Sequence, residues 1–128
     1  MRHYQPKRNN PYRLPHNVYM QCLYAVRDYD RIRKERDDLL YASPLHDGQP
    51  TAPGAPDPVA NTVMRRSALD KMCEDVEQAL ILVPPEYRKG IMDNILYGAS
   101  YPLDAGEATY KRWRCKLIYF VAKNKNLV

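Results

Sequence analysis

The prolines of this chain decide where helices can form, because a proline donates no backbone N–H and clashes with the preceding helical turn. Five of the 11 prolines fall within residues 44–58, together with two glycines, and Pro84 and Pro85 stand side by side. A regular hydrogen-bonded element cannot run through either place. The prolines therefore predict a loop over residues 44–58 and a break at Pro84, with helical segments between them.

Apolar residues before this loop recur at alternating steps of four and three residues from Val18 to Leu39. This spacing is the stripe of an amphipathic helix. Opposite charges four residues apart, such as Asp30 and Lys34, add support on its outer face. The pattern predicts one long helix over residues 16–42.

A second long helix is predicted after the loop. Asp57 and Pro58 suit the N-cap and the first helical turn, and the apolar spacing continues from Leu69 to Val83, where the two prolines stop it. We expect the two long helices to form an antiparallel pair.

Two further helices are predicted in the last third of the chain. The first covers residues 86–97 and ends at Gly98, which suits a C-terminal stop. The second starts near Glu107, because Asp104 and Glu107 have the spacing of a capping box and an apolar stripe from Tyr110 to Val121 follows. No strand pattern competes, so the sequence predicts an all-α fold.

Length and charge limit the classes of function. A chain of 128 residues can bury one core, which excludes an enzyme of several lobes. The 20 basic and 15 acidic residues give a net charge of +5, and the basic excess lies at the two ends of the chain. The apolar runs are far shorter than the ~20 residues that cross a bilayer, and the N-terminus lacks a signal-peptide pattern. We therefore expect a cytoplasmic protein with no membrane partner.

Patterns typical of catalysis and metal binding are weak. The sequence has no glycine-rich phosphate loop, no nucleophilic serine turn and no metalloprotease motif. Cys22, Cys73 and Cys115 lie too far apart along the chain for a zinc-binding pair, and their apolar neighbours favour buried free thiols. We expect no enzyme activity, no cofactor and no metal site.

Basic residues of the last predicted helix lie on the side away from Trp113, Leu117 and Phe120. A helix with an apolar docking face and a cationic outer face is what the DNA major groove accepts, although a solvated basic face has the same pattern. The N-terminal segment, residues 1–15, is also basic and holds three prolines. It is either an arm for a phosphate backbone or minor groove, or a disordered tail. Its basic residues are Arg2, Lys7, Arg8 and Arg13.

A family resemblance rests on four stretches, which are DLLYAS, SPLHDGQPTAPGAPDP, VMRRSALDKMCEDVEQAL and ATYKRWRCKLIYFVAKN. Their order over residues 14–128 resembles small transcriptional regulators of the RinA and ArpU type from phages and prophages. The resemblance implies an activator of late genes in a bacterial host cell, with a C-terminal helix-turn-helix similar to region 4 of sigma factors. It implies double-stranded DNA as the partner, with host RNA polymerase as a further expected partner. The near-heptad stripe from Val18 to Leu39 adds a second copy of the chain as an expected partner. Carried onto this sequence, the DNA-binding residues are Glu107, Thr109, Lys111, Arg112, Arg114, Lys116 and Lys123.

The combined expectation is a basic arm over residues 1–15 and a single helical domain over residues 16–128, with a helix-turn-helix-like unit at 85–124. One departure from the family is the connection GASYPLDAG, which replaces a short helix and a tight turn. Two other functions therefore stay open. One is a helical protein-interaction module, such as a phage adaptor or inhibitor of a host protein, and the other is a small terminase-like packaging protein.

Overall fold

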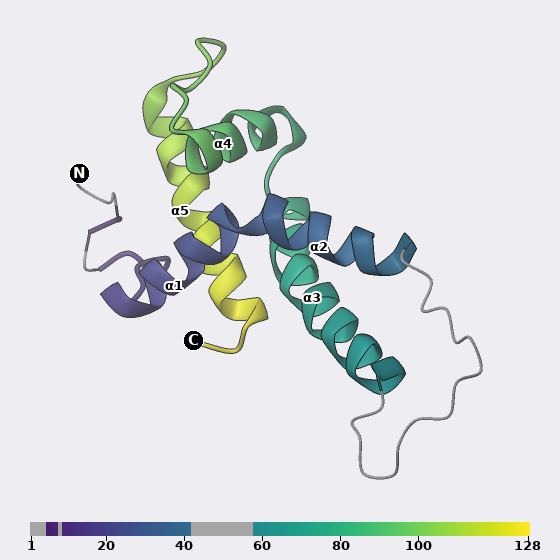
Figure 1. Cartoon of the computed structure of the whole chain (residues 1–128). Helices are drawn as coiled ribbons and strands as arrows, with labels where there is room; N and C mark the ends of the chain where they lie inside the picture. The colour runs from purple at the N-terminus through teal and green to yellow at the C-terminus, as the bar shows by residue number, and fades with distance from the viewer. Residues whose placement is uncertain (1–4, 8, 42–57) are drawn as a thin grey trace.

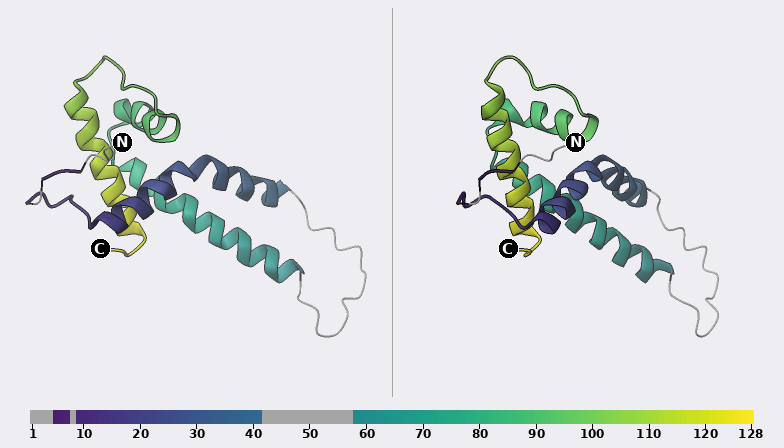
Figure 2. Two further views of the ribbon diagram at one scale, coloured as in Figure 1. Left: turned by 60° about the vertical axis from the view of Figure 1, so that its left-hand side comes forward. Right: turned by 90° about the vertical axis from the view of Figure 1, so that its left-hand side faces the viewer.

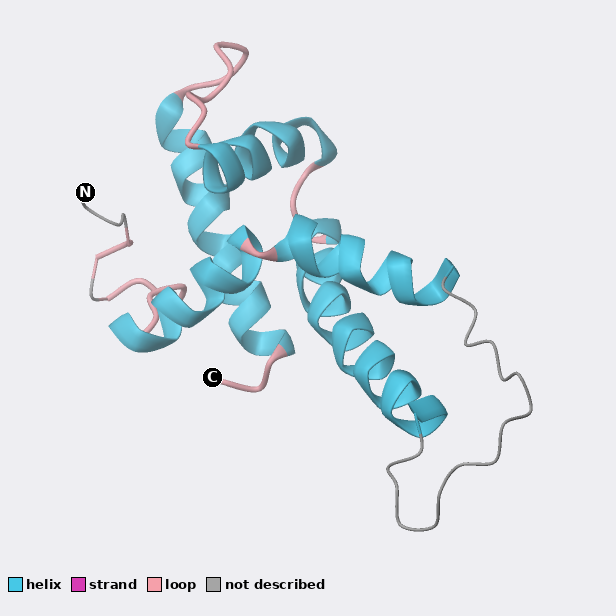
Figure 3. Ribbon diagram, viewed as in Figure 1, coloured by secondary structure: helices cyan, strands magenta, loops and turns pink. Residues whose placement is uncertain are grey.

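The computed structural model describes residues 5–7, 9–41 and 58–128. Every regular element in these ranges is a helix, which confirms the all-α prediction (Figure 1 and Figure 3). The helices are α1 (His16–Arg27), α2 (Tyr29–Tyr41), α3 (Pro58–Ile81), α4 (Pro85–Tyr97) and α5 (Glu107–Asn124).

Some predicted features lie outside the described residues. They are the loop over residues 44–58, apart from Pro58, the N-cap residue Asp57, and Arg2 and Arg8 of the predicted arm.

Helix α5 lies at the centre of the helical body, with α1, α3 and α4 packed against it (Figure 1). Its apolar residues recur at helical spacing and cover a broad part of its surface, so it contributes to the core along most of its length. Fully buried residues of α5 are Tyr110, Leu117, Ile118, Val121 and Ala122. The surrounding helices contribute Cys22, Leu23, Val26, Val76, Ala79, Ile91 and Ile95, and the connection from α3 to α4 contributes Val83.

The predicted antiparallel pair is formed by α2 and α3, and α2 with the first part of α3 projects from the rest of the helices (Figure 2). Helix α2 has no fully buried residue, so ion pairs contribute to its attachment. The Arg36 guanidinium lies 3.2 Å from the Glu77 carboxylate, and Arg65 of α3 pairs with Glu35 of α2. Because these pairs are partly solvated, each contributes no more than about 1 kcal/mol.

The helix predicted over residues 16–42 is divided at Asp28, which corrects the prediction. The Asp28 N–H still donates to the Tyr24 carbonyl at 2.9 Å, and its backbone stays near helical angles. The division allows α1 to pack on α5 while α2 packs on α3 (Figure 2). The apolar spacing continues across Asp28, so the change of direction comes from tertiary packing.

Helix α5 begins without the predicted capping box. Gly106 occupies the N-cap position and no side chain caps the helix. The Asp104 carboxylate instead accepts a hydrogen bond from the Tyr110 hydroxyl at 2.5 Å. This bond holds the proton on the hydroxyl and raises the pKa of Tyr110 to about 12. Asp104 therefore fixes the connection onto the first turn of α5.

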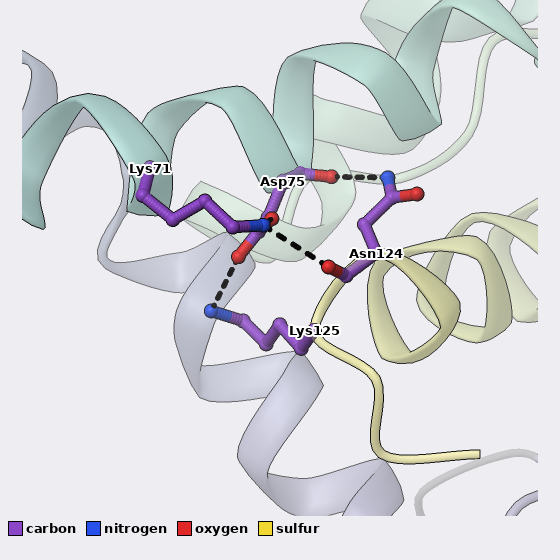
Figure 4. Close-up of polar contacts among 4 residues, drawn as sticks. All are labelled: Lys71, Asp75, Asn124 and Lys125. Carbon is purple, nitrogen blue, oxygen red and sulfur yellow. Dashed lines mark hydrogen bonds and ion pairs between the residues drawn. The ribbon is translucent and has the colours of Figure 1, made fainter.

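A buried carboxylate joins α3 to the end of α5 (Figure 4). Asp75 is 4% exposed, and its carboxylate pairs with Lys71 and, at 3.1 Å, with Lys125. The Asn124 amide donates to the Asp75 backbone carbonyl at 2.9 Å, and the Lys71 ammonium donates to the Asn124 carbonyl at 3.1 Å. Since a buried charge is tolerated where it is paired, these contacts set the position of α5 along α3.

We expect Asp75→Ala to lower the free energy of unfolding by about 2–3 kcal/mol, somewhat less than for a fully buried ion pair because Lys71 is exposed to water. Urea unfolding followed by circular dichroism measures the change. Asp38→Ala removes an exposed carboxylate on α2 and should change the free energy by less than about 0.5 kcal/mol. Equal effects of the two substitutions would contradict the assigned role of Asp75.

Gly90 lies where α4 touches the connection to α5. A Cβ at this position would lie 2.7 Å from Pro102 Cδ and 2.9 Å from Tyr110 Cε1. Alanine inside a helix is otherwise more favourable than glycine by up to about 1 kcal/mol. The packing of the connection therefore opposes the intrinsic helix preference at this residue.

We expect Gly90→Ala to lower the free energy of unfolding by about 1–2 kcal/mol, because overpacking outweighs the gain in helix propensity. Gly106→Ala adds the same methyl group where no atom beyond the chain neighbours lies within 4 Å. It therefore avoids overpacking, and its effect should be limited to the poorer N-cap preference of alanine, at most about 1 kcal/mol. Urea unfolding of both variants gives the comparison. A Gly90→Ala protein that is more stable than the parent would show that Pro102 and Tyr110 do not pack closely enough against α4 to exclude a methyl group.

Candidate nucleic-acid interface

Helices α1, α3 and α4 pack against α5 (Figure 1), and the side turned away from its buried residues carries Thr109, Arg112, Lys116 and Lys123. We call this side the outer strip. Most of the predicted DNA-binding residues reach the surface, although the spacing of Glu107 and Lys111 puts them on the side of the buried Arg114 and Ile118 and not on this strip. The residues that reach the surface are the exposed Glu107, Arg112 and Lys123 and the partly buried Thr109, Lys111 and Lys116.

Arg114 does not face outward, which corrects the prediction for this residue. It is 8% exposed, and its Nη1 donates to the Tyr19 hydroxyl of α1 at 2.8 Å. Its Nε has no hydrogen-bond partner among the described residues. Position 114 follows the buried Tyr110 by four residues and therefore falls on the same side of the helix. Arg114 holds α1 against α5 and is not presented to a phosphate.

We expect Tyr19→Phe to lower the free energy of unfolding by about 1–3 kcal/mol, because the buried guanidinium loses its acceptor. Arg112→Met, on the outer strip, should change stability by less than about 0.5 kcal/mol. Thermal or urea unfolding distinguishes the two. A Tyr19→Phe protein as stable as the parent would mean that the bond to Arg114 contributes nothing to the fold.

The start of α5 is nearly neutral. Lys111 pairs with Glu107, one turn away, at 3.3 Å. The Thr109 N–H donates to the Gly106 carbonyl at 3.0 Å, which leaves its side chain for other contacts. Since the Glu107 carboxylate repels a phosphate, net positive charge on the outer strip begins at Arg112.

The cations further along the outer strip differ from those of α2 and α3 in their partners. On α2 and α3 most basic side chains pair with carboxylates, as Arg36 does with Glu77. Over the described ranges of the chain, no carboxylate pairs with Arg112, Lys116 or Lys123. A cation without an acidic partner keeps its full charge for an anionic ligand.

The N-terminal arm, in its described residues 5–7 and 9–15, packs against the fold. The Tyr12 ring meets the Tyr119 ring of α5 edge-on, with 5.2 Å between centroids. Leu14 is buried within the core. The Arg13 guanidinium donates to the Pro6 carbonyl at 2.6 Å, so its charge is used partly within the arm. Residues 12–14 are therefore part of the folded structure and not a separate tail.

Lys116 lies between two aromatic rings. Its Nζ is 4.4 Å from the centroid of the Trp113 ring on the same helix and 5.2 Å from that of the Tyr12 ring in the arm. Lys116 is predicted to lie on the side of α5 away from Trp113, and the structure corrects this, because residues three apart on a helix are neighbours. Neither Tyr12 nor Trp113 is predicted to act at this site. The three-residue spacing of Trp113 and Lys116 is the signal that would have identified one of them.

The prediction of buried free thiols is confirmed for Cys22, Cys73 and Cys115. Burial raises the pKa of Cys22 and of Cys115 to about 11, so both thiols stay protonated near neutral pH. Among the described residues, no three histidine, cysteine or acidic side chains are grouped as metal ligands. In the same part of the chain, no helix combines the length and the apolar character that a bilayer crossing requires.

Comparison of the chain with known protein families, with curated proteins and with solved structures found no match. The resemblance to regulators of the RinA and ArpU type therefore stays a prediction.

Proposed function

We propose that this chain is a DNA-binding transcriptional regulator of the RinA and ArpU type, an activator of late phage or prophage genes, and that it binds DNA through the outer strip of α5. The observation that carries the proposal is the set of cations without carboxylate partners, Arg112, Lys116 and Lys123. Duplex DNA presents one negative charge per ~1.7 Å of its axis. Three such cations along one side of a helix supply the charge attraction that this binding requires.

The arrangement of α4 and α5 supports a helix-turn-helix-like role. Helix α4 lies beside the N-terminal half of α5 (Figure 1 and Figure 2). Their connection, residues 98–106, is longer than the three to four residues of a standard motif. It is nevertheless packed in place, because the Tyr101 ring stacks on the Tyr110 ring with 5.2 Å between centroids. The longer connection therefore keeps the first turns of α5 in a fixed position.

The roles of the residues follow from their places on the helix. In helix-turn-helix proteins the first turns of the recognition helix contact base edges, and other basic groups contact phosphates. Thr109 and Glu107 are the base-contacting candidates, since a carboxylate can accept from the cytosine amino group. Arg112, Lys116 and Lys123 are the phosphate-contacting residues.

We expect the double substitution of Lys111→Ala with Arg112→Ala to weaken DNA binding and to flatten its salt dependence. The slope of log K against log salt should fall by about 1, because Lys111 is paired with Glu107 and only Arg112 is assigned to a phosphate. Binding is measured on fragments from the gene's own neighbourhood and on unrelated DNA at several salt concentrations. A preference of about 1,000-fold for one fragment marks a sequence-specific regulator. The helical circular dichroism signal should not change.

The matched control carries Lys34→Ala with Arg66→Ala, which removes the same charge from α2 and α3. This variant should keep the parent's affinity and salt slope. Parent-like binding by the Lys111 and Arg112 variant, or equal losses in the two variants, would remove the outer strip as the binding surface.

A protein-interaction module is the second candidate, and exposed apolar side chains of α2 and α3 favour it. They are Leu40, Tyr41, Val63 and Met64. Large exposed apolar groups that lie together mark interaction sites. A pull-down from nuclease-treated host lysate tests this candidate. A stoichiometric protein partner, with no measurable affinity for DNA, would favour it over the regulator.

A further inference from the structure

A hollow of about 240 Å³ lies between the arm and α5. On the α5 side it is lined by Arg112, Cys115 and Lys116, and on the arm side by Pro6 and residues 10–12. It opens beside the outer strip and is therefore accessible to a ligand that approaches that strip.

The arm side of the hollow has a defined shape. The Asn10 side-chain oxygen accepts the Tyr12 N–H at 2.8 Å, which closes a tight turn. The Tyr12 ring packs edge-on against Tyr119 and Phe120 of α5. These contacts hold the arm at a fixed separation from α5, so the hollow is a preformed space.

The charge in the hollow is of one sign. Arg112 and Lys116 are four residues apart, so their side chains lie one turn apart on one side of α5. Cys115 adds no negative charge, because burial raises the pKa of its thiol to about 11. Among the residues that the structure describes, no acidic side chain lines the hollow. Two cations without acidic partners make it a site for an anion.

Lys116 is positioned before any ligand arrives. The rings of Trp113 and Tyr12 lie 4.4 Å and 5.2 Å from its Nζ, and contacts of this kind restrict the side chain. The ammonium has three N–H donors, so it can face both rings and still donate to an anion. Because the side chain is already ordered, binding costs less conformational entropy.

The size of the hollow limits the ligand. Pockets that enclose a drug-sized molecule have volumes of roughly 300–1,000 Å³, and this hollow is smaller. A single phosphate with part of its attached sugar suits both the volume and the paired charges. The wall formed by the Tyr12 ring and the prolines is uncharged and suits the face of a sugar or base.

We propose that the hollow between the arm and α5 binds one phosphodiester group of a nucleic-acid backbone, with Arg112 and Lys116 as its ligands and Tyr12 against the neighbouring sugar. The inference rests on the proposed function, which makes DNA the partner. It adds that the arm contributes by forming the second wall of a phosphate site on α5.

The test is a titration of the ¹⁵N-labelled full chain with dithymidine monophosphate, which contains a single phosphodiester, at low salt. Trp113 is the only tryptophan, so its indole N–H gives one peak that reports on the surroundings of Lys116. We expect a saturable shift of this peak and of the Tyr12 amide peak. Thymidine, which lacks the phosphate, should bind at least ~10-fold more weakly.

Two variants test the assigned residues. Arg112→Gln with Lys116→Gln should weaken dinucleotide binding by at least ~10-fold, because both charged donors are lost. Tyr12→Leu should weaken it by about 3-fold, because Lys116 loses one of its rings. The control, Lys34→Gln with Arg66→Gln, carries the same change in net charge and should bind like the parent. Retained dispersion of the amide spectrum shows that each variant is folded.

Any of three results would overturn the inference. The first is the absence of a saturable shift in the parent, and the second is a dinucleotide affinity of the Arg112 and Lys116 variant equal to that of the parent. The third is tighter binding of thymidine 5′-monophosphate than of the dinucleotide, which would assign the hollow to free nucleotides. Duplex DNA is measured in parallel. Duplex binding without dinucleotide binding would contradict the phosphate site in the hollow but leave the proposed function intact. Dinucleotide binding without duplex binding would contradict the proposed function but leave the anion site in the hollow.

Discussion

Burial of α5 by three other helices is the constraint on which the rest of the structure depends. Tyr110, Leu117, Ile118 and Val121 are fully buried, and burial of each such side chain contributes on the order of 1.5–3 kcal/mol. Because the core is built around α5, only the side chains of α5 that the other helices do not cover can contact a ligand. The side chains that remain outside include Arg112, Lys116 and Lys123, which lie on the side turned away from the buried residues.

The two parts of the molecule use charge in different ways. Between α2 and α3, opposite charges meet, and the Arg36 guanidinium contacts both Asp37 and Glu77. This arrangement attaches a helix that has no fully buried residue of its own. On α5 the charges beyond Lys111 are of one sign and have no acidic partner within the described chain. Charge therefore supports the fold at one end of the molecule and remains free for a ligand at the other.

Much of the fold could be predicted from the sequence, because local patterns determine it. The apolar spacing and the prolines place the helices, and Pro84 and Gly98 mark ends that the structure confirms. The division at Asp28 could not be predicted, since the apolar pattern runs through it and contacts distant in sequence turn the chain. The same holds for Asp104, whose spacing fits a cap but whose partner is Tyr110.

The candidate site was predictable to a similar extent. A helical projection places Arg112 outside, but it does not reveal that Arg114 meets Tyr19 of another helix. The position of Tyr12 against α5 has no sequence signal, because an arm rich in prolines has no periodicity that points to a docking surface. Features that depend on residue spacing along one helix could be predicted. Contacts between segments that are distant in the sequence could not.

The separation of buried and outer positions on α5 has a consequence for how such a protein can change over evolutionary time. Substitutions at exposed positions such as Glu107 cost little stability, so under the proposed function the preference for one DNA sequence can drift while the scaffold persists. Lys116 is different, because it is shared between the outer strip and the arm. A homologous protein that binds a different DNA sequence can thus differ at most positions of the strip without losing stability. A change at Lys116 requires a matching change at Tyr12, because the two side chains are in contact.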